Sequence, residues 1–256
     1  MSKKNARWRK LDNAAKLYSA ASNKKDTRVF RFYCELKEEV NPKALQEALN
    51  QTIETFPTFL MVLRKGFFWH YLEPCNLRPI VKEEYKEPCS RLYIRDKKTL
   101  LFEVTYYKKR INFEVFHVLT DGTGATEFLK ELVKNYLYLV HKEEGLEQIT
   151  LLPEDMTVQD QEDDSFLKYY SKNQKRPKKK KLNAFQIRRK KKDGNHLHVH
   201  ESVVSVQAVL KRSRELGVSM TVFLTALFMM AINEEMSKMQ KKKPVVLMVP
   251  VNLRKF

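Results

Sequence analysis

The stretch Ile111–Gly124 reads Ile-Asn-Phe-Glu-Val-Phe-His-Val-Leu-Thr-Asp-Gly-Thr-Gly and determines how the rest of the chain is interpreted. Its first seven residues alternate in polarity, which predicts a strand with His117 at its inward end. Two of the chain's six glycines follow in a turn, where glycine suits a sharp change of direction. Apolar residues then recur at helical spacing over residues 125–140. We therefore predict a strand, a turn that contains Asp121, and a helix.

A buried imidazole beside a carboxylate and a tight glycine turn suits proton transfer. The ordinary pKa of histidine lies near neutral pH, so a neutral imidazole is available there as a base. The alternative is a core histidine capped by a turn carboxylate, which has no chemical role. The residues of this stretch alone leave both interpretations open.

The first part of the chain, residues 1–140, is predicted to be an α+β domain with a largely antiparallel or mixed sheet. Asn41 and Pro42 are typical of the start of a helix, and Pro57 ends that helix. The expected elements are a short helix near residues 11–18, a strand at 28–36, a helix at 42–56, strands at 59–64 and 67–72, a hairpin of 99–107 with 111–117, and a helix at 125–140.

The second part of the chain is divided by its charge pattern. Residues 141–195 lack periodicity and contain an acidic run followed by twelve lysines and arginines between Lys172 and Lys192, which is typical of a charged linker or crossover. Residues 196–256 are predicted to start a second subdomain. Its expected elements are a strand at 196–204, helices at 205–216 and 222–239, and a strand at 245–251.

Composition limits the class of protein. The 256 residues are 43% hydrophobic and 11% aromatic, which is enough for a globular core. The three cysteines are an odd number at no metal-like spacing, so we expect free thiols in a reducing, cytoplasmic setting. No signal peptide is expected, and the longest apolar run, Thr221–Ile232, is too short to cross a bilayer.

Two further patterns suggest other functions. The basic run at 172–192, within a net charge of +18, could contact an anionic surface, but it lacks interleaved aromatic residues and predicts no specific nucleic acid. His196-x-His198-x-His200 places three imidazoles on one strand face, yet no fourth ligand is clear, and we expect a polar strand face with no metal.

Three strings resemble one family. His117-x-x-x-Asp121-Gly122 resembles the signature of the acyltransferase superfamily that includes chloramphenicol acetyltransferase and the condensation domains of peptide synthetases. Leu-Asp-Asn-Ala-Ala-Lys at 11–16 resembles the start of bacterial alcohol O-acetyltransferase-like proteins, and Pro-Val-Asn-Leu-Arg at 250–254 resembles a string of their second half. The resemblance implies a two-layer sandwich, a mixed sheet with helices on one face, followed by the start of a similar subdomain.

The resemblance also implies roles for residues. His117 would be the general base, and Asp121 would turn away from substrate and pair with Arg254, which orients the loop. Gly122 would let the backbone pass close to the substrate. Thr120 and Thr123 are candidates for substrate binding, or for turn and cap roles.

The implied reaction moves an acyl group, acetyl above all, from an acyl-CoA or carrier thioester to a hydroxyl or amine acceptor. It needs no resident cofactor and no acyl-enzyme. Because family members continue well beyond this length, we expect the chain to be truncated after the beginning of the second half. A non-catalytic family member that acts as a binding module is therefore the main alternative to an enzyme.

Overall fold

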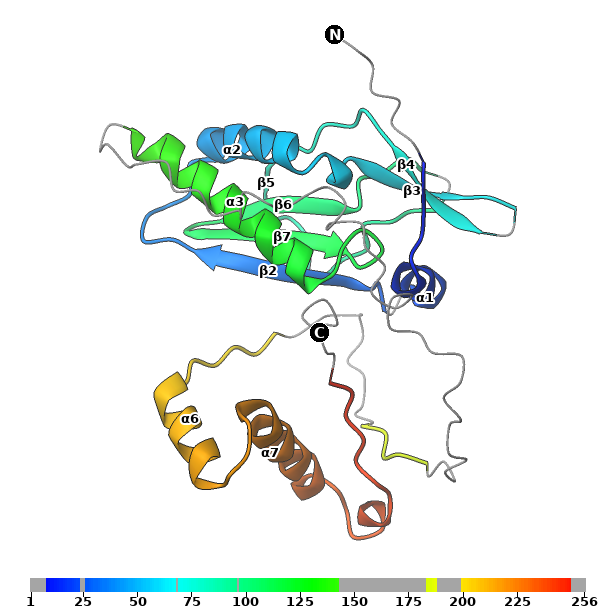
Figure 1. Ribbon diagram of the computed structural model, residues 1–256, viewed down its shortest axis with the longest axis vertical. Helices are drawn as coiled ribbons and strands as arrows, with labels where there is room; N and C mark the ends of the chain where they lie inside the picture. The colour runs from blue at the N-terminus through cyan, green and yellow to red at the C-terminus, as the bar shows by residue number, and fades with distance from the viewer. Residues whose placement is uncertain are drawn as a thin grey trace. The chain divides into compact units, whose positions relative to one another are not determined.

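Strand β7 (Arg110–Phe116) is an inner strand of a four-stranded mixed sheet in the order β2-β7-β6-β5 (Figure 1). Its antiparallel neighbours are β2 (Val29–Glu35) and β6 (Phe102–Tyr107), and the short β5 (Lys82–Glu83) pairs parallel to β6. The predicted strand at 28–36, the predicted hairpin around residues 108–109 and the mixed sheet are confirmed.

The computed structural model describes residues 8–23, 26–67, 69–95, 97–142, 183–187 and 199–249. The chain divides into two units, Met1–Lys168 and Tyr169–Phe256. The division falls inside the segment predicted as a charged linker, most of which lies outside the described residues. Each unit is described by itself.

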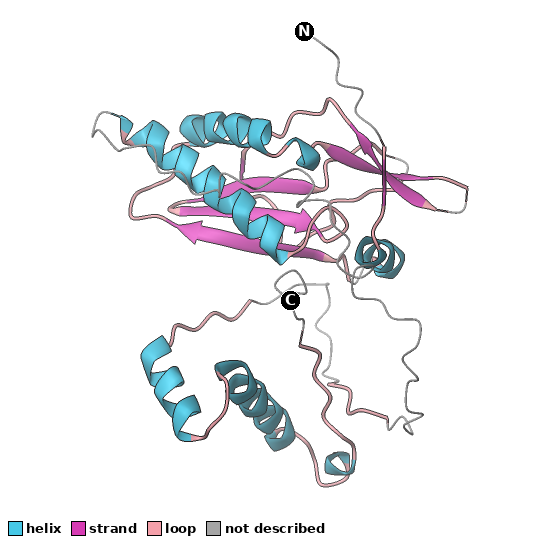
Figure 2. Ribbon diagram, viewed as in Figure 1, coloured by secondary structure: helices cyan, strands magenta, loops and turns pink. Residues whose placement is uncertain are grey.

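Helices α2 (Pro42–Thr55) and α3 (Gly122–Val140) pack against each other over one face of the sheet (Figure 2). The Asn41 side chain accepts hydrogen bonds from the first-turn N–H groups of α2, and the short helix η1 (Pro57–Phe59) follows, as the proline signals predict. Phe128 on α3 stacks on Phe113 of β7 with ring centroids 4.6 Å apart, in a core of fully buried side chains. The two-layer arrangement with helices on one face is confirmed.

The opposite face of the sheet is also covered, which the sequence pattern did not indicate. Glu114 is only 2% exposed and Asn112 is fully buried, although both alternate with the apolar residues of β7. The Tyr93 ring stacks over Phe116 at 6.0 Å, so part of the loop between β5 and β6 lies on this face. Strand β7 is therefore buried on both sides, and its polar residues must find partners there.

A second sheet and a short helix complete the first unit. Strands β1 (Arg9–Lys10), β4 (His70–Pro74) and β3 (Met61–Lys65) form an antiparallel sheet in that order. The predicted hairpin is confirmed, but its turn spans Gly66–Trp69, further along than the predicted turn at residues 65–66. Helix α1 (Asn13–Ala21) begins at Asp12, whose side chain accepts a hydrogen bond from the Ala15 N–H at 2.6 Å.

The second unit contains α6 (Val206–Glu215), α7 (Met220–Glu234) and the short helix η3 (Gln240–Lys242). Ser205 caps α6 and Ser219 caps α7, so both predicted helices are confirmed, although α7 ends at Glu234 and not at 239. The predicted strands are wrong over the described residues 199–204 and 245–249, because no neighbouring strand pairs with them there.

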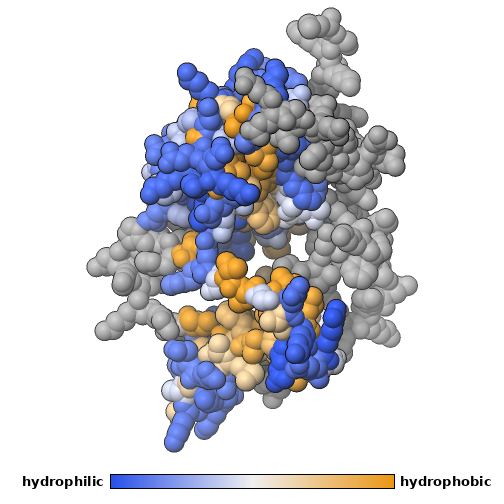
Figure 3. Space-filling model, turned by 90° about the vertical axis from the view of Figure 1, so that its left-hand side faces the viewer, coloured by the Kyte–Doolittle hydropathy of each residue, from blue (hydrophilic) through white to orange (hydrophobic). Residues whose placement is uncertain are grey.

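Helix α7 is apolar around its circumference yet has no buried residue. Figure 3 shows apolar side chains gathered on the second unit. The exposed apolar side chains of α7 include Leu224, Leu227 and Phe228. Among the described residues no single helix is long and apolar enough to span a membrane, while α6 and α7 together, bent by 89°, meet the criteria of length and composition.

Candidate active site

His117 follows directly after the last residue of β7, at the point where the chain turns toward α3. Its backbone N–H donates to the carbonyl of Arg28 at 3.0 Å, and Arg28 adopts a left-handed φ of 56° just before β2. The Leu119 N–H donates to the carbonyl of Phe116 at 2.9 Å and closes the turn. The backbone of His117 is therefore held by the start of one strand and the end of another.

Two aromatic rings hold the imidazole. The Tyr18 ring, from α1, stacks on it almost parallel, with centroids 4.2 Å apart and planes 10° apart. The Phe30 ring, from β2, contacts it with a centroid distance of 4.4 Å. Both residues are far from His117 in the sequence, and only the fold brings the three together. The imidazole thus has a defined plane in a half-buried position.

Burial lowers the pKa of His117 below the ordinary value of 6.5. The carbonyl of Thr120, the charge of Asp121 and the carbonyl of His117 itself oppose that effect, while the charge of Arg28 adds to it. Nδ1 is buried and has no partner of regular hydrogen-bond geometry among the described residues, so those carbonyls act as nearby charge and not as regular acceptors. The lowered pKa of His117 favours the neutral form of the ring.

Asp121 is the N-cap of α3. Its Oδ1 accepts a hydrogen bond from the Gly124 N–H at 2.9 Å, and its carbonyl accepts from the Ala125 N–H at 3.0 Å. The sequence shows the usual signal for this role, an aspartate directly before an apolar periodic run. The predicted pairing of Asp121 with Arg254 remains a prediction, because Arg254 lies outside the described residues.

The two glycines of the turn differ. A Cβ at Gly122 would lie 3.9 Å from Phe32 Cζ, which is an ordinary van der Waals contact. A Cβ at Gly124 would overlap the Thr120 side-chain oxygen. Only Gly124 is therefore required by packing. The predicted roles of Gly122, Thr120 and Thr123 toward a substrate remain predictions, with Thr120 half-buried and Thr123 exposed.

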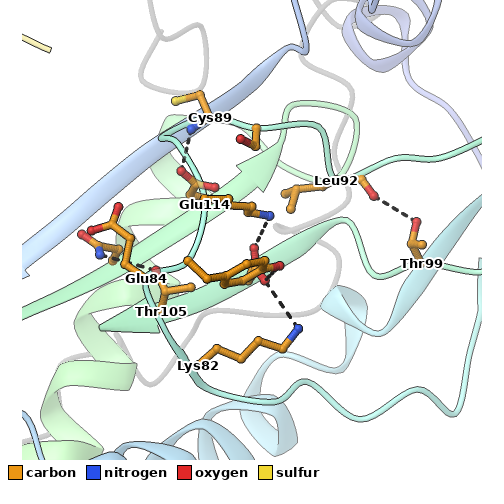
Figure 4. Close-up of polar contacts among 12 residues, drawn as sticks. Lys82, Glu84, Cys89, Leu92, Thr99, Thr105 and Glu114 are labelled. Carbon is orange, nitrogen blue, oxygen red and sulfur yellow. Dashed lines mark hydrogen bonds and ion pairs between the residues drawn. The ribbon is translucent and has the colours of Figure 1, made fainter. Parts of the chain in front are cut away.

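A charged cluster surrounds Glu114 on the face of the sheet opposite α2 and α3 (Figure 4). Glu114 accepts hydrogen bonds from Arg31 Nε at 2.8 Å and from the Cys89 N–H at 2.6 Å, and Arg31 also donates to Glu84 at 2.6 Å. Burial alone would lower the pKa of Arg31, but the two carboxylates outweigh it and raise that pKa. Burial and the charge of Glu114 raise the pKa of the Cys89 thiol.

No three side chains of the metal-binding types come together in the described part of the chain. Of the three histidines considered as ligands, His196 and His198 lie outside it, so that alternative is untested. All three cysteines are free thiols.

The mixed sheet and the two helices on one face define an α+β fold, with the histidine at the end of an inner strand. The family profile described as alcohol acetyltransferase matches residues 79–256, more than half of the chain, including His117 and Asp121. The chain therefore belongs to the alcohol acetyltransferase family, a branch of the superfamily of chloramphenicol acetyltransferase and the condensation domains.

Solved structures with a similar arrangement include the starter condensation domain of the rhizomide synthetase RzmA, at 13% identity and a TM-score of 0.45, which covers 56% of this chain and 40% of that one. The first condensation domain of the calcium-dependent antibiotic synthetase, solved with a substrate analogue, has 14% identity and a TM-score of 0.43, over 57% and 40% of the two chains. Polyketide synthase associated protein 5 from Mycobacterium tuberculosis has 16% identity and a TM-score of 0.42, over 57% and 36%.

The chain spans about 40% of the length of the condensation domains that it matches. No curated protein sequence matches it.

Proposed function

We propose that the chain carries the general base of an acyltransferase, with His117 in that role. The observation that carries the proposal is the position of this imidazole at the end of β7, half-buried and held between Tyr18 and Phe30. Its lowered pKa favours the neutral ring, which is the form a base needs. Membership in the alcohol acetyltransferase family supports acyl transfer as the reaction class.

The proposed mechanism transfers the acyl group directly. The neutral ring takes the proton of an acceptor hydroxyl or amine as the acceptor oxygen or nitrogen attacks the thioester carbonyl. The carbon–sulfur bond then breaks, and the proton passes to the leaving thiolate. Asp121 stabilises the imidazolium that forms in between, because its negative charge favours the protonated ring. General base catalysis of this kind contributes about 10²–10⁴-fold.

The proposed donor is an acyl-CoA. A variant of the rhizomide starter condensation domain was solved in complex with C8-CoA, which supports this donor class for a chain of the same superfamily. The family description favours an alcohol as acceptor over an amine. A carrier-protein thioester is the other donor to be tested, and an amine is the other acceptor. We also propose a cytoplasmic location, because acyl-CoA is made and used there.

The test measures release of free CoA from acetyl-CoA and from C8-CoA by the whole chain, with a panel of alcohols and amines, and identifies the acylated product by mass spectrometry. We expect His117→Ala to lower the rate by about 10²–10⁴-fold. His70→Ala is the matched control, because burial and the charges of Lys65 and Arg95 lower the pKa of His70 as well, and His70 lies in β4 of the other sheet.

Equal rates for the wild type and His117→Ala would reject the catalytic role. Saturable acyl-CoA binding by calorimetry, without turnover by the wild type, would instead support a binding module.

A further inference from the structure

The turn of the β3–β4 hairpin has an unusual composition. Gly66 and Trp69 close it through a hydrogen bond from the Gly66 N–H to the Trp69 carbonyl at 2.7 Å, and the sequence between them is Phe-Phe. Tight hairpin turns normally carry glycine, asparagine or aspartate, which suit their backbone and are well solvated. Exposed aromatic residues at such a turn are unusual, which makes this surface a candidate for contact with a partner.

Two aromatic side chains at this turn, those of Phe67 and Trp69, are exposed. Phe67 is 96% exposed and Trp69 is 61% exposed. Trp8 lies just before the neighbouring strand β1, is 53% exposed, and contacts Tyr71 of β4 edge to face. The hairpin projects at the edge of the first unit (Figure 1), and we call the exposed rings of Phe67, Trp69 and Trp8 the aromatic tip.

Positive charge surrounds the aromatic tip. The three strands carry Arg9, Lys10, Arg64 and Lys65 against one acidic residue, Glu73, which pairs with Arg64 at 3.1 Å. The pKa of His70, beside the turn, is lowered first by burial and then by the charges of Lys65 and Arg95. The local field is therefore positive at the place where the aromatic rings are exposed.

We propose that the β3–β4 hairpin, together with β1, docks on an anionic lipid membrane. Phe67 and Trp69 would enter the interfacial layer, where aromatic rings are favoured, and Lys10 and Lys65 would contact the lipid phosphates. A protein partner fits less well, because a stable protein interface needs about 800 Å² on each side and the tip offers only a few side chains.

The chain provides its own reporter for this contact. Its only two tryptophans, Trp8 and Trp69, both lie on the proposed surface. Docking should shift their fluorescence to shorter wavelength and protect them from a soluble quencher. The probe is a vesicle made of equal parts of phosphatidylcholine and phosphatidylglycerol, and vesicles of phosphatidylcholine alone are the neutral comparison.

We expect the whole chain to sediment with the mixed vesicles with a blue shift of emission, and to bind neutral vesicles much more weakly. Phe67→Ser, which keeps both tryptophans, should weaken binding by about ten-fold. Lys65→Glu should weaken it by about ten-fold as well, because a charge near the surface changes sign, and high salt should reduce its effect.

Two exposed apolar residues elsewhere serve as matched controls, Ile80→Ser at 64% exposure and Phe228→Ser at 57% in α7. Both should bind like the wild type, and circular dichroism should show that all variants are folded. Vesicle binding with unchanged tryptophan emission would overturn the proposal in favour of another surface, such as the basic segment 172–192. A concentration-dependent emission shift without vesicles would overturn it in favour of a contact between proteins.

Discussion

At the scale of one residue, the pKa of His117 is set by opposing effects. Burial by the Tyr18 and Phe30 rings disfavours the charged imidazolium, whereas the nearby carboxylate of Asp121 favours it. Burial is the larger effect, so the pKa of His117 falls below 6.5. A base in this state remains neutral at pH values where an ordinary histidine is already half protonated, and Asp121 then assists when the proton arrives.

Asp121→Asn separates the two functions of this side chain. Asparagine caps a helix about as well as aspartate, so the cap at Gly124 should survive while the negative charge disappears. Without that charge the pKa of His117 should fall further, and the acid limb of the profile of kcat/KM against pH should move to lower pH. Asp121→Ala, which also loses the cap, should destabilise the fold by about 0.5–2 kcal/mol, measured by urea unfolding. An acid limb that moves to higher pH in Asp121→Asn would contradict the assignment.

Gly124→Ala and Gly122→Ala form a matched pair in one helical turn. Alanine at a helical position normally stabilises by about 1 kcal/mol relative to glycine. At Gly124 the new Cβ would overlap the Thr120 side chain, so we expect destabilisation by about 1–3 kcal/mol. At Gly122 there is room, so we expect no loss. The double variant Thr120→Ala with Gly124→Ala should recover the stability, and equal denaturation midpoints for the two single variants would refute the overlap.

At the scale of elements, β7 is fixed by packing on one face and by charge on the other. Phe113 stacks on Phe128 toward the helices, while Glu114 binds Arg31 and the loop at Cys89 on the opposite side. The end of this strand carries His117. A charge as deeply buried as that of Glu114 is tolerated only because its oxygens are matched by donors.

Glu114→Gln should therefore be costly. Among the described residues, the variant leaves Arg31, which is 14% exposed, with Glu84 as its carboxylate partner. We expect a loss of about 2–3 kcal/mol, somewhat below the value for a fully broken buried pair. The control is Glu35→Gln, because the pair of Glu35 with Arg110 spans 3.8 Å at the surface and should be worth less than about 1 kcal/mol. Similar losses for both variants would show that the cluster is not buried in solution.

The elements with local signals were predictable from the sequence. The alternation of Phe30 and Phe32 identified β2, and Asn41-Pro42 identified the start of α2. Glu114 could not be placed, because alternation assigns a charged residue to the exposed face and its partners come from distant segments. The apolar run at 245–251 predicted a strand that the described residues 245–249 do not form. Such a run shows that a segment tends to be buried, but it does not show that a partner strand is present.

The same limit applies to the candidate site. The motif identified His117 and Asp121, because both lie in one short stretch. Tyr18 and Phe30, which hold the ring, carry no motif of their own, and the sequence predicts only that they lie in a short helix and in a strand. Contacts between residues distant in sequence follow from the fold, and a single sequence does not contain them.

At the scale of the whole molecule, the two units differ in where their apolar side chains lie. Fully buried aromatic and aliphatic residues gather in the first unit, whereas α7 of the second unit leaves its apolar side chains exposed. A helix that is apolar on all sides is normally buried. The stability of the chain should therefore come from the first unit.

Two phenylalanines on helices test this difference. Phe128 on α3 is fully buried and Phe228 on α7 is 57% exposed. Phe128→Ala should cost about 3–5 kcal/mol in urea unfolding, and Phe228→Ala should stay within about 0.5 kcal/mol of the wild type. A large loss for Phe228→Ala, or a change of molecular mass in sedimentation, would mean that α7 is covered in solution.

The most direct test of the account is the titration of the His117 imidazole by NMR, compared with the acid limb of kcat/KM for acyl transfer. We expect His117 to titrate below pH 6.5, the acid limb to follow the same pKa, and Asp121→Asn to lower both. A pKa of His117 above 6.5, or an acid limb that does not follow the titration of this residue, would contradict a neutral His117 as the base.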